Sequence, residues 1–251
     1  MQKIAQVTAI FWIMKICATT LGETAGDLLS QTLNVGYAIS SMILFSIFLV
    51  SLIFQLFSNK YHPFLYWTVI LTTSTAGTTM SDYMDRSLGL GYATGSFILV
   101  CILLAIFSIW YFSERSLNVN NITTRKVEVI YWIAILFSNT LGTALGDFLA
   151  DSSGLGFVGG AVLIGSLLGI ILLLTYFTNV SRVFLFWLAF VLTRPFGATF
   201  GDLLTKSHAK GGLDLGTMGS SLVLVTILIA LIIYTTLNAS KIKQSPELNA
   251  S

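Results

Sequence analysis

A single motif recurs four times along the chain and restricts its fold more than any other feature. The motif is a tryptophan, nine further residues, a glycine, four further residues and an aspartate. It occurs at Trp12–Gly22–Asp27, Trp67–Gly77–Asp82, Trp132–Gly142–Asp147 and Trp187–Gly197–Asp202. Because the spacing is identical in all four copies, the motif indicates internal repetition. We therefore expect the chain to consist of four copies of one structural unit.

Each unit contains two apolar stretches. The first, or odd, stretches cover residues 10–30, 65–85, 129–150 and 184–205, and the second, or even, stretches cover 36–57, 91–112, 156–177 and 216–237. A second glycine opens the even stretches at Gly36, Gly91, Gly156 and Gly216, the last displaced by a five-residue insertion in "KSHAKGGLD". About 20 apolar residues in a helix cross a hydrocarbon core. The pattern predicts eight transmembrane helices.

The composition agrees with a membrane location. Of the 251 residues, 55 % are hydrophobic and 10 % are charged, against about 25 % charged in a soluble domain. We predict an all-α membrane protein in which residues 1–240 form one transmembrane domain, with repeats at 10–57, 65–112, 129–177 and 184–237. Residues 241–251 are expected to form a short polar cytoplasmic tail. A net charge of +2 gives no reason to expect a nucleic-acid partner.

Two crossings per unit insert every unit the same way up, so the repeats are parallel and related by an axis along the membrane normal. The economical packing places the odd helices inside and the even helices toward lipid. Lys and Arg are more frequent in the loops and termini on one side, which predicts that both termini are cytoplasmic. The tryptophans are then expected as anchors at the cytoplasmic interface. The two sets of basic residues are Lys3, Lys60, Arg115, Arg125, Lys126, Arg182, Lys241 and Lys243 against Arg86, Lys206 and Lys210.

Each odd helix carries a polar stripe at positions i, i+4 and i+8, which share one helix face. The four stripes are Lys15, Thr19, Glu23 and Asp27; Ser74, Thr78 and Asp82; Asn139, Thr143 and Asp147; and Arg194, Ala198 and Asp202. Pairs of small residues four apart run beside them and allow helix backbones to approach closely in lipid. These pairs are Gly22/Gly26, Gly77/Ser81, Gly142/Gly146 and Gly197/Gly201. We expect the stripes to converge on a central polar cavity.

Carboxylates inside a membrane are costly, at roughly 2.5–3.5 kcal/mol each on insertion scales, and commonly mark an ion or substrate path. The candidate ion-binding residues are Asp27, Asp82, Asp147, Asp202, Glu23, Thr19, Ser74, Thr78, Asn139, Thr143, Arg194 and Lys15, the five acids being candidate metal ligands. Oxygen ligands favour hard cations such as Mg²⁺, Ca²⁺ or Mn²⁺. Lys15 and Arg194 are interpreted as counter-ions within this acidic cluster. The predicted function is transport of a small cation, with Mn²⁺ as the first candidate and no cofactor.

Other interpretations of the same residues stay open. One alternative is that the aspartates cap the ends of the odd helices. Proton-coupled export of a small organic solute, or a scaffold role, would use the same features. An enzyme is not expected: the first glycine of the Gly-x-Gly-Asp motif of intramembrane aspartyl proteases, three residues before the aspartate, is replaced here by Thr24, Thr79, Ala144 and Thr199. Asp85, Asp151 and Asp214 are expected in solvated loops and His208 at the surface, and the oligomeric state is left open.

The repeated block, as in "GETAGD", "GTALGD" and "GATFGD", resembles a largely uncharacterised family of bacterial integral membrane proteins built from four internal repeats. The resemblance covers nearly the whole chain and implies a location in the inner (plasma) membrane. It implies no particular substrate. The second copy, "GTTMSD", departs from the block, as does the fourth through its insertion.

Overall fold

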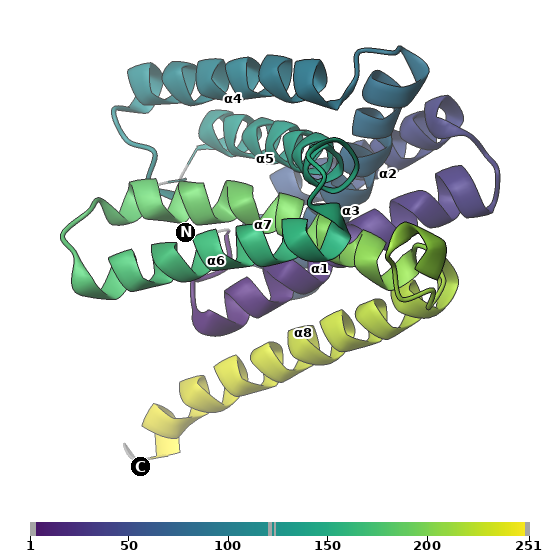
Figure 1. The fold of residues 1–251 in the computed structure, drawn as a ribbon. Coiled ribbons are helices and arrows are strands. Elements are labelled where there is room, and N and C mark those ends of the chain that lie inside the picture. Colours follow the sequence, from purple (N-terminus) through teal and green to yellow (C-terminus); the bar gives the residue numbers. More distant parts are fainter. Residues whose placement is uncertain (1–3, 120–121, 123, 249–251) are drawn as a thin grey trace.

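The computed structural model describes residues 4–119, 122 and 124–248, with side chains described through residue 238. Within these residues the fold is all-α and contains eight long helices (Figure 1). They are α1 (Ala9–Asp27), α2 (Tyr37–Phe57), α3 (Pro63–Asp82), α4 (Tyr92–Glu114), α5 (Arg125–Asp147), α6 (Gly156–Phe177), α7 (Arg182–Thr205) and α8 (Thr217–Leu248). The predicted all-α class is thus confirmed, and α8 continues as helix into the segment expected as a polar tail.

Six of the described helices are long and apolar enough to cross a membrane: α2, α4, α5, α6, α7 and α8. The other two, α1 and α3, are of similar length, with 19 and 20 residues, but are more polar. In α1 the polarity includes the charged residues Lys15, Glu23 and Asp27. The chain is a multi-pass membrane protein.

The sequence indicated that the odd helices end just past the motif aspartates, but three of them continue further. Each continues through one wider, π-helical turn, at Leu28–Thr32 (η1), Tyr83–Ser87 (η2) and Phe148–Ser152 (η4). The fourth unit has instead the inserted loop with a short 3₁₀ turn, His208–Lys210 (η5). After each turn or loop the second glycine of the unit has a positive φ, between +66° and +82°. Glycine adopts this conformation without a Cβ penalty, which explains its recurrence.

The odd helices form a closed ring in which α1 packs on α3, α3 on α5, α5 on α7 and α7 on α1. Each even helix packs on the odd helix of the following unit: α2 on α3, α4 on α5 and α6 on α7, while α8 returns to α1. In Figure 1, α5 accordingly lies between α4 and α7. The units therefore interlock around the ring.

The motif glycines are the points where neighbouring odd helices touch. Gly22 faces Ser74, Gly77 faces Asn139, Gly142 faces Arg194 and Gly197 faces Thr19. The partner always lies three residues before the motif glycine of the next unit, so one contact is repeated around the ring. A Cβ at Gly77 would lie 2.9 Å from the Asn139 Cβ, which is closer than side chains approach one another. The small-residue lines are thus packing surfaces between odd helices.

The motif tryptophans lie at the opposite end of the odd helices from the aspartates. Among these four residues, Trp67, Trp132 and Trp187 are buried and Trp12 is partly buried. They pack on aromatic side chains of neighbouring helices, and the Tyr66 and Tyr131 hydroxyls are 3.0 Å apart in the same layer. The three buried rings therefore contact other aromatic side chains rather than lipid, and their expected depth at the cytoplasmic interface stays a prediction. Together with their aromatic neighbours, these rings form a layer at one end of the ring of odd helices.

Candidate functional site

The four motif aspartates meet at one end of the ring. Asp27, Asp82, Asp147 and Asp202 are all buried, with at most 3 % of each residue exposed. Because the aspartates gather at one end and the aromatic residues at the other, the four odd helices run in the same direction. Burial of four carboxylates requires partners, since an unpaired buried charge is strongly unfavourable. The partners are two basic side chains that come one helical turn later.

Arg86 joins the second and third units. It lies on η2, four residues after Asp82, and its Nε is 3.0 Å from Asp82 Oδ1. Its Nη2 donates to Asp147 Oδ2 at 2.9 Å, and its Nη1 donates to the Tyr37 hydroxyl at 3.2 Å. The guanidinium also lies near the rings of Tyr37 and Tyr92. The Arg86 guanidinium thus compensates part of the negative charge of two buried carboxylates on neighbouring odd helices.

Lys206 joins the fourth and first units in the same way. It follows the last residue of α7, four residues after Asp202, and its Nζ lies 3.0 Å from Asp202 Oδ1 and 2.5 Å from Asp27 Oδ2. Gln31 Nε2 donates to the other Asp27 oxygen at 2.5 Å. Burial lowers the pKa of Lys206, but the Asp202 and Asp27 carboxylates raise it by more, so its pKa lies above that of a free lysine. The ammonium is therefore a fixed positive charge.

These contacts decide between two interpretations of the aspartates. Asp27, Asp82 and Asp147 have α-helical backbone angles inside a continuous helical path, and their side chains make no capping hydrogen bond. Among the described residues, the contacts of the four carboxylates are with side chains instead. The capping interpretation is therefore wrong. The aspartates form a buried ionic layer.

A second ionic layer lies deeper in the ring. Arg194 on α7 and Glu23 on α1 are both buried, and Arg194 Nη1 donates to Glu23 Oε2 at 3.1 Å. The Thr78 and Thr143 hydroxyls each donate to the same Glu23 oxygen at 3.2 Å. The described contacts of Arg194 reach all three other odd helices: the Thr19 and Ser74 carbonyl oxygens and the Thr78 and Thr143 hydroxyls. The Arg194 side chain therefore occupies the axis at this level, where a cavity was expected.

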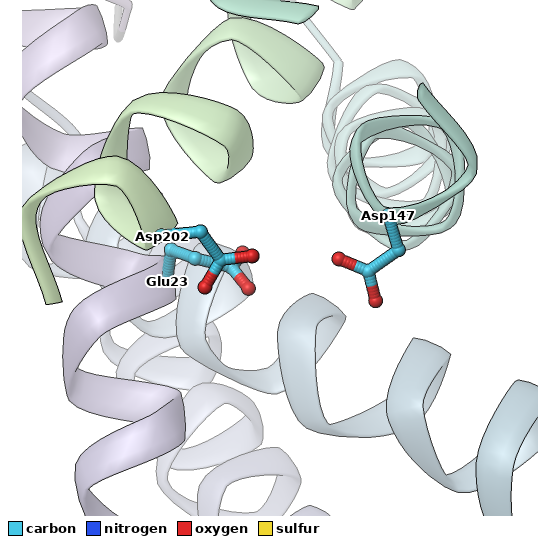
Figure 2. A group of neighbouring side chains, drawn as sticks. All are labelled: Glu23, Asp147 and Asp202. Atoms are coloured by element: carbon cyan, nitrogen blue, oxygen red, sulfur yellow. The ribbon is translucent and has the colours of Figure 1, made fainter. Parts of the chain in front are cut away.

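Three carboxylates, one from the deeper layer and two from the outer layer, lie close to one another. Oxygens of Glu23, Asp147 and Asp202 lie within 4.8 Å of one another, and they come from α1, α5 and α7. Figure 2 shows the three side chains pointing toward a common space between these helices. Oxygen atoms from separate helices at this spacing form an arrangement that a hard cation prefers. We call this group the acidic triad.

Other stripe residues lie apart from the acidic triad. Lys15 is fully buried, and its Nζ lies 4.0 Å from the centre of the Phe190 ring, so its expected role as a counter-ion in the acidic cluster is wrong. It lies three helical turns before Asp27, too far to reach the aspartates. Asn139 donates to the Thr73 hydroxyl at 3.0 Å rather than to an ionic layer. Arg194 is the counter-ion that the sequence predicted.

The remaining acids differ in burial from one unit to the next. Asp151 and Asp214 are exposed, as expected, and so is His208. Asp85 is buried, contrary to expectation, because it packs against Gly95 of α4. Asp85 and Asp151 both lie on π-helical turns, η2 and η4, rather than in the loops that were expected. The Ser81 hydroxyl donates to Asp85 Oδ2 at 3.3 Å.

Sequence reasoning missed two residues of the site, Arg86 and Lys206, and used them only as loop charges for orientation. A signal was present, because both lie four residues after a motif aspartate and extend its stripe by one turn. The balance of charge changes as a result. Five acids, Glu23 and the motif aspartates, lie with three bases, Arg86, Arg194 and Lys206, rather than with Lys15 and Arg194 alone.

Four segments of the chain, residues 10–61, 65–116, 130–181 and 185–239, match a protein family described as a Repeat of Unknown Function (DUF347). The matches cover most of the chain. The chain belongs to this family. Each DUF347 repeat contains one odd and one even helix, which confirms the four units and the resemblance seen in the sequence. No curated protein and no solved structure matches the chain. The family description carries no activity, so a functional argument rests on the site.

Proposed function

We propose that this protein is a membrane transporter, and not an enzyme, that carries a small hard divalent cation, with Mn²⁺ as the first candidate. The observation that carries the proposal is the acidic triad, in which oxygens from three helices lie within 4.8 Å of one another. Ca²⁺ binds oxygen at 2.3–2.6 Å and Mg²⁺ at 2.0–2.1 Å, so two ligands of one ion are separated by at most about 4–5 Å. Small shifts of the three side chains would thus suffice to bind one ion.

The balance of charge supports a divalent substrate. In the outer layer, four aspartates face Arg86 and Lys206, which leaves two negative charges when every group is ionised. In the deeper layer, Glu23 and Arg194 compensate each other. One divalent cation would therefore neutralise the buried site. Two protons would do the same, which provides a basis for exchange of protons against the metal.

The proposed path follows the axis of the ring. We place all eight helices across the membrane, the odd helices inside, the axis along the membrane normal and both termini in the cytoplasm. The triad then lies between Arg194 on the cytoplasmic side and the two bridging cations, Arg86 and Lys206, on the outer side. Arg194 on one side, and Arg86 with Lys206 on the other, are thus two positively charged barriers that a moving cation must displace or pass. The described conformation is closed at both barriers.

The experiment that tests this function is Mn²⁺ uptake into vesicles containing the purified protein, with a metal-sensitive fluorophore inside. Asp147→Asn and Glu23→Gln remove a charged ligand at nearly constant shape, and we expect each to reduce the initial rate at least tenfold. Asp214→Asn is the matched control, because Asp214 is exposed in the loop after α7 and lies outside the triad. Its uptake rate should equal that of the unmodified protein.

Binding should be measured beside transport, by titrating Mn²⁺ into the detergent-solubilised protein and recording the electron paramagnetic resonance signal of the free ion. The expected result is one bound ion per chain, lost in Asp147→Asn and retained in Asp214→Asn. Unchanged flux in the double variant Asp82→Asn/Asp147→Asn would overturn the proposal. Binding without flux would favour a metal-dependent scaffold over a transporter.

A further inference from the structure

A long apolar groove lies on the outside of the ring, between α4 and α7. Leu104 and Phe107 of α4 form one wall, Trp187 and Val191 of α7 form the other, and Leu141 of α5 contributes to the floor. The groove has a volume of about 720 Å³. It lies between two helices that both pack on α5 and that contact each other through the Trp187, Phe107 and Trp110 rings.

The groove leads to a second, smaller pocket at the end where α7 begins. The two share Leu117 and Val183, and the second pocket adds Arg182 and Asn118. Trp187 Nε1 donates to the Leu117 carbonyl at 2.9 Å, which fixes the junction between α4 and α5 against the groove. No acidic residue is among the described residues that line the two pockets. Among the described residues, Arg182 is exposed and has no ion-pair partner.

The dimensions and the distribution of charge match one kind of molecule. The α7 residues that line the groove run from Val183 to Val191, a rise of about 12 Å at 1.5 Å per residue. This is close to half of a hydrocarbon core roughly 30 Å thick, that is, to one leaflet. The positive charge of Arg182 lies at the end of the groove where α4 ends and α7 begins. The groove thus has an apolar part of acyl-chain length and a basic part where a headgroup would lie.

We infer that this groove is a binding site for an anionic phospholipid, with an acyl chain between α4 and α7 and the headgroup phosphate at Arg182. The inference does not depend on the proposed transport of a cation. The bound lipid would fill the space beside Trp187 and hold α4 against α7, which contact each other through the rings of Trp187, Phe107 and Trp110. It would therefore stabilise the ring on the side where the link between units is longest.

The test measures lipid retained by the full chain. The protein is purified in mild detergent, and phosphatidylglycerol or phosphatidylethanolamine is titrated while bound lipid is counted by native mass spectrometry. We expect one retained phosphatidylglycerol per chain and a preference over phosphatidylethanolamine of about fivefold, the effect of one basic residue acting on an anionic lipid. Arg182→Gln should abolish the preference. Arg125→Gln, a basic residue at the start of α5 that lines neither pocket, should keep it.

A second pair of variants tests the apolar part. Leu104→Trp fills the groove from α4, whereas Leu172→Trp places the same ring on α6 at a position of similar exposure, 57 % against 60 % for Leu104. Leu104→Trp should lose the retained lipid, and Leu172→Trp should retain it. Equal retention in both tryptophan variants, or equal selectivity in both arginine variants, would overturn the inference. So would a dimer that carries no lipid and dissociates in Leu104→Trp, because the groove would then hold a second copy of the chain.

Discussion

The guanidinium of Arg194 donates to the carboxylate of Glu23 at 3.1 Å, and the two residues lie on α7 and α1, which are the last and first odd helices of the ring. No other unit has a charged residue at either position: the equivalents are Thr19, Ser74 and Asn139 for Arg194, and Thr78, Thr143 and Ala198 for Glu23. The ion pair therefore closes the ring at the one junction that chain connectivity does not make. The hydroxyls of Thr78 and Thr143, from the second and third units, donate to the same Glu23 oxygen.

We predict that Arg194→Met destabilises the protein by about 3–5 kcal/mol, because it leaves the Glu23 carboxylate buried without its partner. The double variant Arg194→Met/Glu23→Gln should recover much of this loss, since it removes both charges. The measurement is the free energy of unfolding in mixed micelles as denaturing detergent is added. Equal stability of the single and double variants would show that the ion pair does not govern the stability of the ring.

Removal of a bridging cation should strengthen metal binding. Lys206→Met takes one positive charge from the outer layer, so Asp27 and Asp202 are left free to attract a cation. A unit charge on the order of 5 Å from a divalent ion is worth more than 1 kcal/mol even at a water-like dielectric constant, so we expect Mn²⁺ to bind roughly tenfold more tightly or better.

Lys206→Arg is the control for this prediction, because it keeps the charge, and its affinity should stay within about threefold of the original. Both variants are titrated with Mn²⁺ at low ionic strength, where screening is weak. Weaker binding by Lys206→Met would mean that Lys206 organises the carboxylates for the metal instead of competing with it.

The sequence was sufficient for the repeated unit and its helices, because tryptophan, glycine and aspartate kept one spacing in four copies. It also predicted which faces of the odd helices carry polar residues, since a stripe at i, i+4 and i+8 follows from helix geometry alone. The contacts between odd helices across the ring could not be predicted from the sequence. That Gly142 packs on Arg194, or that Arg86 reaches Asp147 in the next unit, depends on the order and crossing of helices, which periodicity does not contain.

The errors at Asp85 and Arg86 have a common cause, which is that the odd helices were expected to end just past the motif aspartates. The helix continues past Asp82 as a π-helical turn, and this keeps Asp85 and Arg86 on helical faces rather than in a loop. Hydropathy falls at these positions, as it does in a loop, so composition alone does not separate the two. The sequence did not show whether the tryptophans contact lipid or neighbouring helices, because an interfacial depth is compatible with both.

The glycine contacts lead to a prediction about stability. In Gly77→Ala the new Cβ would lie 2.9–3.0 Å from Asn139 and from the backbone of Thr140, so we expect a loss of about 1–3 kcal/mol from overpacking. Gly169→Ala on α6 is the matched control, because nothing lies within 4 Å of its Cβ position. It should be neutral or stabilising by up to about 1 kcal/mol, the helix preference of alanine over glycine. Similar unfolding free energies for the two variants would contradict close helix contact at Gly77.

The parallel arrangement of the units predicts which residues lie on the same side of the membrane. Single cysteines are placed in a chain whose two native cysteines, Cys17 and Cys101, have been replaced by serine. Four exposed positions report on the two ends of the ring: Asp151 and Asp214 on the end with the aspartates, and Asn59 and Asn179 on the end with the tryptophans. Labelling of intact cells with a membrane-impermeant maleimide should modify the first pair only, and labelling of inverted membrane vesicles the second pair only.

The excess of basic residues at the tryptophan end is the reason to expect that end in the cytoplasm. If Asp151 and Asp214 were labelled from opposite sides, the third and fourth units would be antiparallel in the membrane, and the carboxylates of α5 and α7 would have no common path to line.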